Sequence, residues 1–305
     1  MPTGRQVDRA DVRLCLRRRR PLVRAGRDQG TQQARAGAHL AAGAGQLSRT
    51  VHRERLPAAV AGHDRSVRLE YLRQVLGEPG RGPVAGGGGR ALVVGSGRGL
   101  LARGVARLGF DVVAADPSPA ATGLARDADD GRGIVHVTAR AEELGLPDGA
   151  FDLVYCADTL EITERPDAVL AEAARVLRPG GTFVYDTVNR TSVSRLLYLG
   201  AFQAFPGTRI MSRGRYAAHR LRRPAELAEA LGRAGLAPGG VTAFKPRDVR
   251  SLARATRGRR RGTVTDGQLP GLVGMVLVPE GRPLVTYLGH AVRADAAGAG
   301  AGAAP

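Results

Sequence analysis

Short apolar runs alternate with amphipathic stretches over most of the chain, and each kind of stretch predicts a different element. The apolar runs are bounded by Gly, Pro or Asp, which is typical of buried strands. The amphipathic stretches carry apolar residues three or four positions apart, which is typical of helices. Strands are predicted at residues 92–94, 110–115, 134–138, 151–156, 182–188, 236–244 and 284–292, and helices at 100–108, 118–126, 167–177 and 224–234. This alternation predicts an α/β protein with a parallel sheet and helices on both faces.

Three glycines, Gly95, Gly97 and Gly99, follow the first predicted strand at alternate positions, and Asp116 ends the second strand. Because glycine has no Cβ, the backbone here can turn tightly and approach a ligand, and the next helix offers unpaired N–H groups. A carboxylate about 20 residues further on is placed to accept hydrogen bonds from two ribose hydroxyls. Together these features predict a cofactor that contains a nucleoside.

The glycine spacing narrows the choice of cofactor. A dinucleotide turn has Gly-x-Gly-x-x-Gly, whereas Gly99 comes one position earlier and Leu100 stands where that pattern needs glycine. The form Gly-x-Gly-x-Gly resembles the first motif of class I S-adenosylmethionine-dependent methyltransferases. The resemblance continues at residues 116–118, 141–142, 146–148, 151–154 and 177–181. A nicotinamide-dependent dehydrogenase is a distant alternative.

This resemblance implies a Rossmann-like methyltransferase fold, with a mostly parallel seven-stranded sheet whose last strand is antiparallel. It also implies S-adenosylmethionine as cofactor and S-adenosylhomocysteine as product. The residues expected to bind the cofactor are Gly95, Ser96, Gly97, Gly99, Asp116, Pro117, Ala141, Glu142 and Cys156.

Two further segments, residues 186–191 and 223–227, are similar to the ubiquinone-biosynthesis O-methyltransferase subfamily. This similarity implies methyl transfer to the oxygen of a phenolic or quinone-precursor compound. An RNA methyltransferase and a cofactor-binding module without turnover are the alternatives. Amino-methylating nucleic-acid enzymes carry an Asn/Asp-Pro-Pro-aromatic motif after the fourth strand, whereas this chain has Cys-Ala-Asp-Thr at residues 156–159.

The chain departs from the family at several positions. The family has an acidic residue two places before the first glycine, and this chain has Val93. After the fourth strand the subfamily has a Glu and then a Glu-His pair, where this chain has Asp158, Glu161 and Ile162. Isoleucine can neither bind a metal nor transfer a proton, so no metal site is predicted, although dependence on a divalent metal stays open.

An O-methyltransferase needs a base or a cation near its acceptor, because a phenol has a pKa of about 10. The candidate catalytic residues are Asp158, Glu161 and His219. The first two follow the fourth strand, and His219 lies in an insertion at residues 189–223. Tyr198, Phe202 and Phe205 share one face if that insertion is helical, so it is the expected binding element for a hydrophobic or aromatic substrate.

Composition sets the outer limits of the chain's organisation. The net charge of +18 is concentrated at the two ends of the chain, and its arginine runs lack interleaved aromatic residues, which disfavours nucleic acid as a partner. Residues 1–60 are predicted to be a poorly ordered Arg-rich extension, residues 61–293 the methyltransferase domain, and residues 294–305 a disordered Ala/Gly tail. Two isolated cysteines and the lack of a signal-like segment predict a cytoplasmic protein, with peripheral membrane contact as a further possibility.

Overall fold

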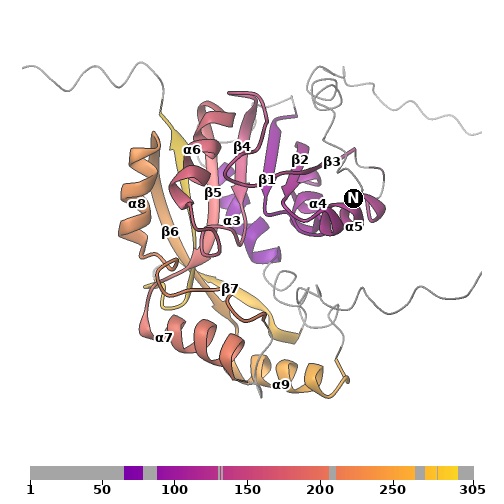
Figure 1. Ribbon diagram of the computed structural model, residues 1–305, viewed down its shortest axis with the longest axis vertical. Coiled ribbons are helices and arrows are strands. Elements are labelled where there is room, and N and C mark those ends of the chain that lie inside the picture. Colours follow the sequence, from indigo (N-terminus) through magenta and orange to yellow (C-terminus); the bar gives the residue numbers. More distant parts are fainter. Residues whose placement is uncertain are drawn as a thin grey trace, which may run out of the picture.

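The computed structural model describes residues 65–77, 88–129, 131, 133–205, 211–264, 272–279 and 281–294 (Figure 1). The predicted extension at residues 1–60 and residues 295–305 of the predicted tail lie outside the described residues. Within the described part of the chain, none of the helices combines the length and the apolar character that crossing a lipid bilayer requires.

The described strands form one twisted sheet with the order β3-β2-β1-β4-β5-β8-β6-β7. The first five in this order are mutually parallel, β8 is antiparallel to both β5 and β6, and β7 is antiparallel to β6. Their bounds are β1 Arg90–Val94, β2 Asp111–Asp116, β3 Val135–Thr138, β4 Phe151–Cys156, β5 Leu177–Val188, β6 Leu236–Pro246, β7 Met275–Val278 and β8 Thr286–Arg293. The predicted Rossmann-like fold with an antiparallel last strand is therefore confirmed.

The number of strands differs from the prediction, because the sheet has eight strands among the described residues instead of seven. The additional strand is β7, a four-residue run that pairs only with β6 at the edge of the sheet. All four of its residues are only partly buried, whereas a central strand is buried on both faces.

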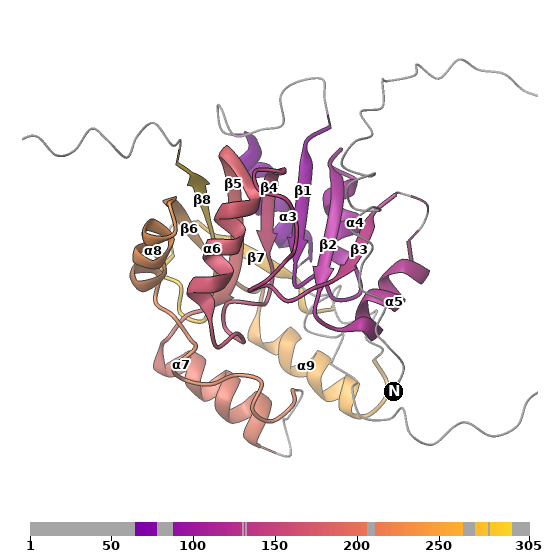
Figure 2. The ribbon, with the colours of Figure 1, turned by 45° about the horizontal axis from the view of Figure 1, so that its top comes forward.

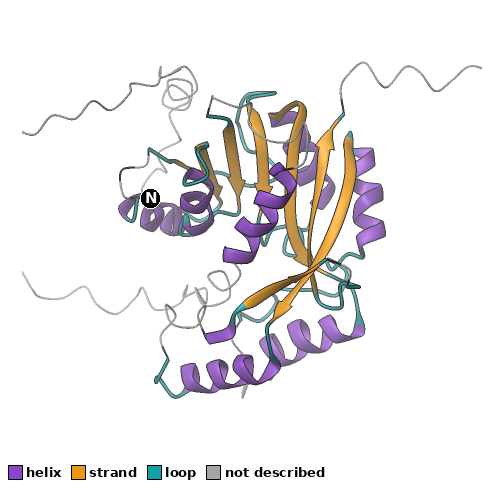
Figure 3. Ribbon diagram, turned by 180° about the vertical axis from the view of Figure 1, so that it is seen from behind, coloured by secondary structure: helices purple, strands orange, loops and turns teal. Residues whose placement is uncertain are grey.

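Helices cover both faces of the sheet, as Figures 1 and 3 show. α3 (Arg65–Gly77) and α4 (Leu100–Ala106) pack on one face, where Leu72 and Val105 are buried against Val93 and Tyr155. α6 (Pro166–Val176) and α8 (Pro224–Arg233) pack on the other face. α5 (Pro119–Asp127) begins after Ser118, whose hydroxyl accepts a hydrogen bond from the Ala121 N–H at 3.2 Å, so the predicted N-cap is confirmed.

The insertion after β5 folds as a short helix α7 (Ser192–Ser194) followed by a π-helical segment η1 (Arg195–Ala204). This helical unit and α9 (Val249–Arg260) lie at the same end of the molecule (Figures 1 and 2). Tyr198 and Phe202 pack on Met211 and Tyr216, which agrees with their predicted shared face. Phe205 does not share it, because Phe205 follows the last helical residue and is 69% exposed.

Candidate functional site

The turn after β1 depends on its three glycines. Gly95, Gly97 and Gly99 have φ angles of 70°, 52° and 70°, a left-handed conformation that side chains rarely adopt. The Ser96 N–H donates to Ala115 O at 3.1 Å, and the Gly99 N–H donates to Ser96 O at 2.9 Å. The first bond joins the turn to the end of β2, and the second lies within the turn, just before α4, whose N-cap is Gly99.

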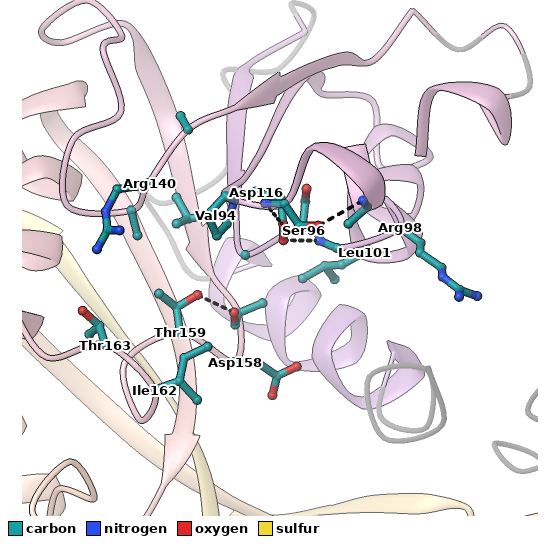
Figure 4. A pocket seen from close by; sticks show the side chains of 18 of the residues that line it. Val94, Ser96, Arg98, Leu101, Asp116, Arg140, Asp158, Thr159, Ile162 and Thr163 are labelled. Atoms are coloured by element: carbon teal, nitrogen blue, oxygen red, sulfur yellow. Dashed lines mark hydrogen bonds between the residues drawn. The ribbon is translucent and has the colours of Figure 1, made fainter. Parts of the chain in front are cut away.

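Asp116, the last residue of β2, closes this turn from the side. Its Oδ2 accepts a hydrogen bond from the Gly97 N–H at 2.8 Å, and its Oδ1 accepts one from the Ser118 N–H at 2.9 Å. Figure 4 shows Asp116 beside Ser96 on one side of the cavity, with Asp158 and Ile162 on the other. The two backbone bonds fix the orientation of the carboxylate.

A cavity of about 550 Å³ lies over the glycine turn, at the carboxyl ends of β1, β2 and β4. Most of the predicted cofactor-binding residues line it, and so does the predicted catalytic residue Asp158. The predicted binding residues in contact with the cavity are Gly95, Ser96, Gly97, Asp116, Pro117, Ala141 and Glu142. Segments that are far apart in the sequence therefore meet around one cavity.

Four predicted residues do not line the cavity. Gly99 instead turns the backbone, and a Cβ at this position would lie 3.0 Å from the His136 ring. Cys156 is fully buried within β4, and this burial raises the pKa of its thiol well above the usual range. His219 is exposed, and its Nε2 lies 3.3 Å from a carboxylate oxygen of Glu164.

Glu161 is the fourth of these residues, and it lies buried behind the cavity wall. Its Oε2 accepts a hydrogen bond from the Thr187 hydroxyl at 3.1 Å. Burial raises the pKa of Glu161, and the nearby carboxylates of Asp158 and Asp186 raise it further. A raised pKa lets a carboxyl group hold a proton near neutral pH.

Sequence reasoning missed two groups beside the cavity. The guanidinium of Arg68 on α3 is 4% exposed, and its Nη2 lies 2.8 Å from Asp158 Oδ1 and 2.7 Å from Asp186 Oδ1. Asp186 appeared in the sequence only as part of a subfamily motif, and nothing in its neighbours indicated a buried charge. No sequence signal indicated the burial of Arg68, and helix α3, which carries it, was not predicted.

The insertion supplies the remaining wall of the cavity through Met211, Arg215 and Tyr216. The side-chain amide of Gln203 holds this segment, because its Nε2 donates to Tyr216 O at 3.0 Å and its Oε1 accepts from the Tyr216 N–H at 2.6 Å. The ring of Tyr198 packs edge-on against that of Tyr216 with the ring centres 4.9 Å apart. The insertion therefore places an aromatic surface at the cavity.

The residues present fit S-adenosylmethionine. A Cβ added at Gly97 would meet no atom within 4 Å, so the turn borders open space. An ionised carboxylate has about four acceptor positions, and the two backbone bonds to Asp116 leave acceptor capacity for the ribose hydroxyls. Apolar side chains such as Leu124 and Ala141 line the same cavity and suit an adenine ring.

The residues that stand in place of the subfamily's Glu and Glu-His pair do not fit a divalent metal. Ile162 lines the cavity beside Asp158 and offers no ligand atom. Asp158 Oδ1 is paired with Arg68. The described residues contain no group of three or more His, Cys, Asp or Glu side chains arranged to hold a metal ion.

Comparisons with known proteins agree with this geometry. A family model described as a methyltransferase domain matches residues 92–185. The ubiquinone biosynthesis O-methyltransferase of Xanthomonas axonopodis pv. citri is 34% identical over 191 residues, which cover 62% of this chain and 76% of that protein. The enzyme of the same name from Mesorhizobium japonicum is 37% identical over 176 residues, which cover 56% of this chain and 70% of that protein.

Solved structures share the fold. The YcgJ protein of Bacillus subtilis is 16% identical, with a TM-score of 0.51. The matched region covers 75% of this chain and 99% of the YcgJ chain. A methyltransferase from Thermotoga maritima, described as a possible histamine N-methyltransferase, is 18% identical, with a TM-score of 0.50. The matched region covers 76% of this chain and 90% of that chain. From its sequence relatives, the chain belongs to the S-adenosylmethionine-dependent methyltransferases, in the family that contains these ubiquinone biosynthesis O-methyltransferases.

Proposed function

We propose that this methyltransferase acts on the hydroxyl oxygen of a phenolic or quinone-precursor acceptor. The observation that carries the proposal is the position of Asp158. Its carboxylate is partly exposed to the cavity, on the side opposite Asp116 (Figure 4). The names of the relatives, ubiquinone biosynthesis O-methyltransferases, support the same class of acceptor.

The proposal divides the cavity into two ends. At one end the Asp116 carboxylate accepts hydrogen bonds from the ribose, while the backbone of Gly95 and Gly97 permits close approach. At the other end Asp158 accepts the proton of the acceptor hydroxyl, which makes the oxygen a better nucleophile. When bound, S-adenosylmethionine supplies an electrophilic methyl group, so the protein has to align the acceptor oxygen with it and exclude water.

The walls at the acceptor end suit a flat, apolar ring. Ile162, Met211 and Tyr216 present apolar surface there, and Gln203 fixes the backbone of Tyr216. Aromatic rings pack favourably on such side chains.

A hydrophobic acceptor also makes peripheral membrane contact part of the proposal. Leu196 and Phe205, on and just after η1, are 71% and 69% exposed, and Arg195 and Arg213 of the same insertion are exposed as well. Apolar side chains flanked by basic ones suit the surface of an anionic bilayer. Cosedimentation with anionic vesicles should fall in the Leu196→Asp variant, and equal binding by both proteins would contradict this contact.

Transfer of a labelled methyl group to catechol tests the proposed function. Wild-type protein should label catechol, and Asp158→Asn should lower kcat by about 100-fold, because general base catalysis contributes about that much or more. The matched control is Asp152→Asn, at the opposite end of β4, which should keep wild-type kcat. Labelling of RNA without labelling of any phenol would contradict the proposal.

A further inference from the structure

Asp158 has an unusual backbone conformation. Its φ angle is 45°, and it is the single non-glycine residue with positive φ among the residues that the structure describes. Residues with a Cβ adopt this conformation at an energetic cost, so the surrounding structure has to hold them in it. Because Asp158 comes two residues after the end of β4 and faces the cavity, this conformation also determines where its carboxylate lies.

Asp186 provides the contacts that hold Asp158. The Asp158 N–H donates to Asp186 Oδ1 at 3.1 Å, and Arg68 Nη2 donates to the same oxygen at 2.7 Å. Arg68 Nη2 also lies 2.8 Å from Asp158 Oδ1. These three residues therefore form a closed cycle of polar contacts, which fixes both the backbone and the carboxylate of Asp158.

This cycle of contacts is buried at Asp186 and partly exposed to the cavity at Asp158. The side chain of Asp186 is 2% exposed, whereas that of Asp158 is 34% exposed. The second oxygen of Asp186, Oδ2, has no hydrogen-bond partner among the described residues, so Oδ1 makes both of the contacts described above. Asp186 does not line the cavity, and it can act on an acceptor only through Asp158 and Arg68.

We propose that Asp186 is a positioning residue for methyl transfer, which holds Asp158 in its left-handed conformation and aims its carboxylate at the acceptor. The proposal rests on the proposed function of Asp158 as the group that meets the acceptor hydroxyl. A misplacement of a catalytic group by about 1 Å can lower a rate by about 100-fold, so the contacts behind Asp158 matter for the reaction.

Two substitutions separate the two contacts of Asp186. Asp186→Asn keeps an oxygen that can accept from the Asp158 N–H but removes the charge that pairs with Arg68. Asp186→Ala removes both contacts. With catechol as acceptor, kcat should fall about tenfold in Asp186→Asn and further in Asp186→Ala, while the Kd for S-adenosylhomocysteine changes less than about twofold.

Asp152→Asn is the matched control, because Asp152 also accepts from a backbone N–H and from an arginine. Its Oδ2 accepts from the Arg90 N–H at 2.7 Å and its Oδ1 from Arg178 Nε at 2.5 Å. This carboxylate lies at the amino end of β4, away from the cavity. The control should lower the melting temperature and leave kcat unchanged.

A double variant distinguishes positioning from a general loss of stability. If Asp186 acts through Asp158, the variant Asp158→Asn with Asp186→Asn should have the same kcat as Asp158→Asn alone. Losses that multiply in the double variant, or wild-type kcat in Asp186→Asn, would overturn the proposal.

Amide hydrogen exchange at Asp158 tests the positioning without any activity. Exchange should be at least about tenfold faster in Asp186→Ala than in the wild type, and equal rates would overturn the inference. If wild-type protein methylates no phenol while this difference in exchange is present, the proposed function fails and the positioning of Asp158 stands.

Discussion

The Gly97 N–H donates a hydrogen bond to Asp116 Oδ2 at 2.8 Å, which joins the turn after β1 to the end of β2. The two residues are 19 positions apart in the chain. Because the Ser118 N–H binds the other oxygen, the carboxylate is held by two backbone groups before any ligand is present. Because this carboxylate is already ordered, it loses little conformational entropy when it binds a ribose.

Replacement of Asp116 should weaken cofactor binding far more than folding. Asp116→Ala removes the acceptors for the ribose hydroxyls, and each hydrogen bond to a charged group contributes about 1.5 to 3 kcal/mol. Calorimetric titration with S-adenosylhomocysteine should show a Kd at least about 100-fold higher. Asp111→Asn, at the other end of the same strand, is the control and should bind like the wild type.

The glycines of the turn should respond differently to alanine. A Cβ at Gly95 would lie 2.3 Å from Ala157 O and 2.4 Å from Thr159 Oγ1, so Gly95→Ala has to displace backbone and should destabilise the protein by about 3 kcal/mol or more. A Cβ at Gly97 would face open space, so Gly97→Ala should lower stability by only about 1 to 2 kcal/mol while weakening S-adenosylhomocysteine binding. Urea unfolding and calorimetry measure the two effects, and equal destabilisation by both substitutions would contradict this distinction.

Most of the fold could be predicted because it depends on local patterns. The bounds predicted for β4 agree with the structure at both ends, and the helix predicted at residues 167–177 differs from α6 by one residue at each end. Apolar runs bounded by turn residues identify central strands that are buried on both faces. β7 was missed because an edge strand of four partly buried residues lacks that pattern.

The cofactor end of the site could also be predicted, since glycines and a strand-end carboxylate have a fixed spacing in the sequence. At the acceptor end the sequence indicated Asp158 and the insertion, which both line the cavity, but not the two residues that hold Asp158. Arg68, Asp158 and Asp186 come together from α3, the loop after β4 and β5, and only the packing of α3 on the sheet shows that one guanidinium pairs with both carboxylates. Burial strongly affects the protonation of such groups, and the neighbouring residues in the sequence do not indicate whether a charged side chain is buried.

Methyl transfer should not depend on a divalent metal. Ile162 stands in the place of a possible ligand, and Asp158 is paired with the guanidinium of Arg68. The initial rate with catechol should stay within about twofold after dialysis against a chelator, because the described residues contain no group of three or more metal-ligating side chains. A rate that disappears on chelation and returns with Mg²⁺ would refute this expectation.

The buried Glu161 should make stability depend on pH. Its pKa is raised from 4.5 to about 8, so between these values the folded state binds a proton that the unfolded state releases. The contribution of Glu161 to the free energy of unfolding is therefore fully present at low pH and lost as the pH rises, by up to about 1.4 kcal/mol per pH unit. The stability of the wild type relative to Glu161→Gln should decrease from about pH 5 to about pH 8.

Urea unfolding at several pH values measures this difference. Glu143→Gln, the same substitution at an exposed glutamate, is the matched control. If the stability difference between the wild type and Glu161→Gln is constant over the range, Glu161 does not hold a proton in the folded protein.

Calorimetric titration of the wild-type protein with S-adenosylhomocysteine and, separately, with NAD tests the central claim most directly. The claim is that the glycine turn and Asp116 hold an adenosyl group whose attached chain carries no pyrophosphate. The account predicts that S-adenosylhomocysteine binds in a one-to-one complex and that NAD gives no measurable heat. Binding of NAD in preference to S-adenosylhomocysteine would contradict it.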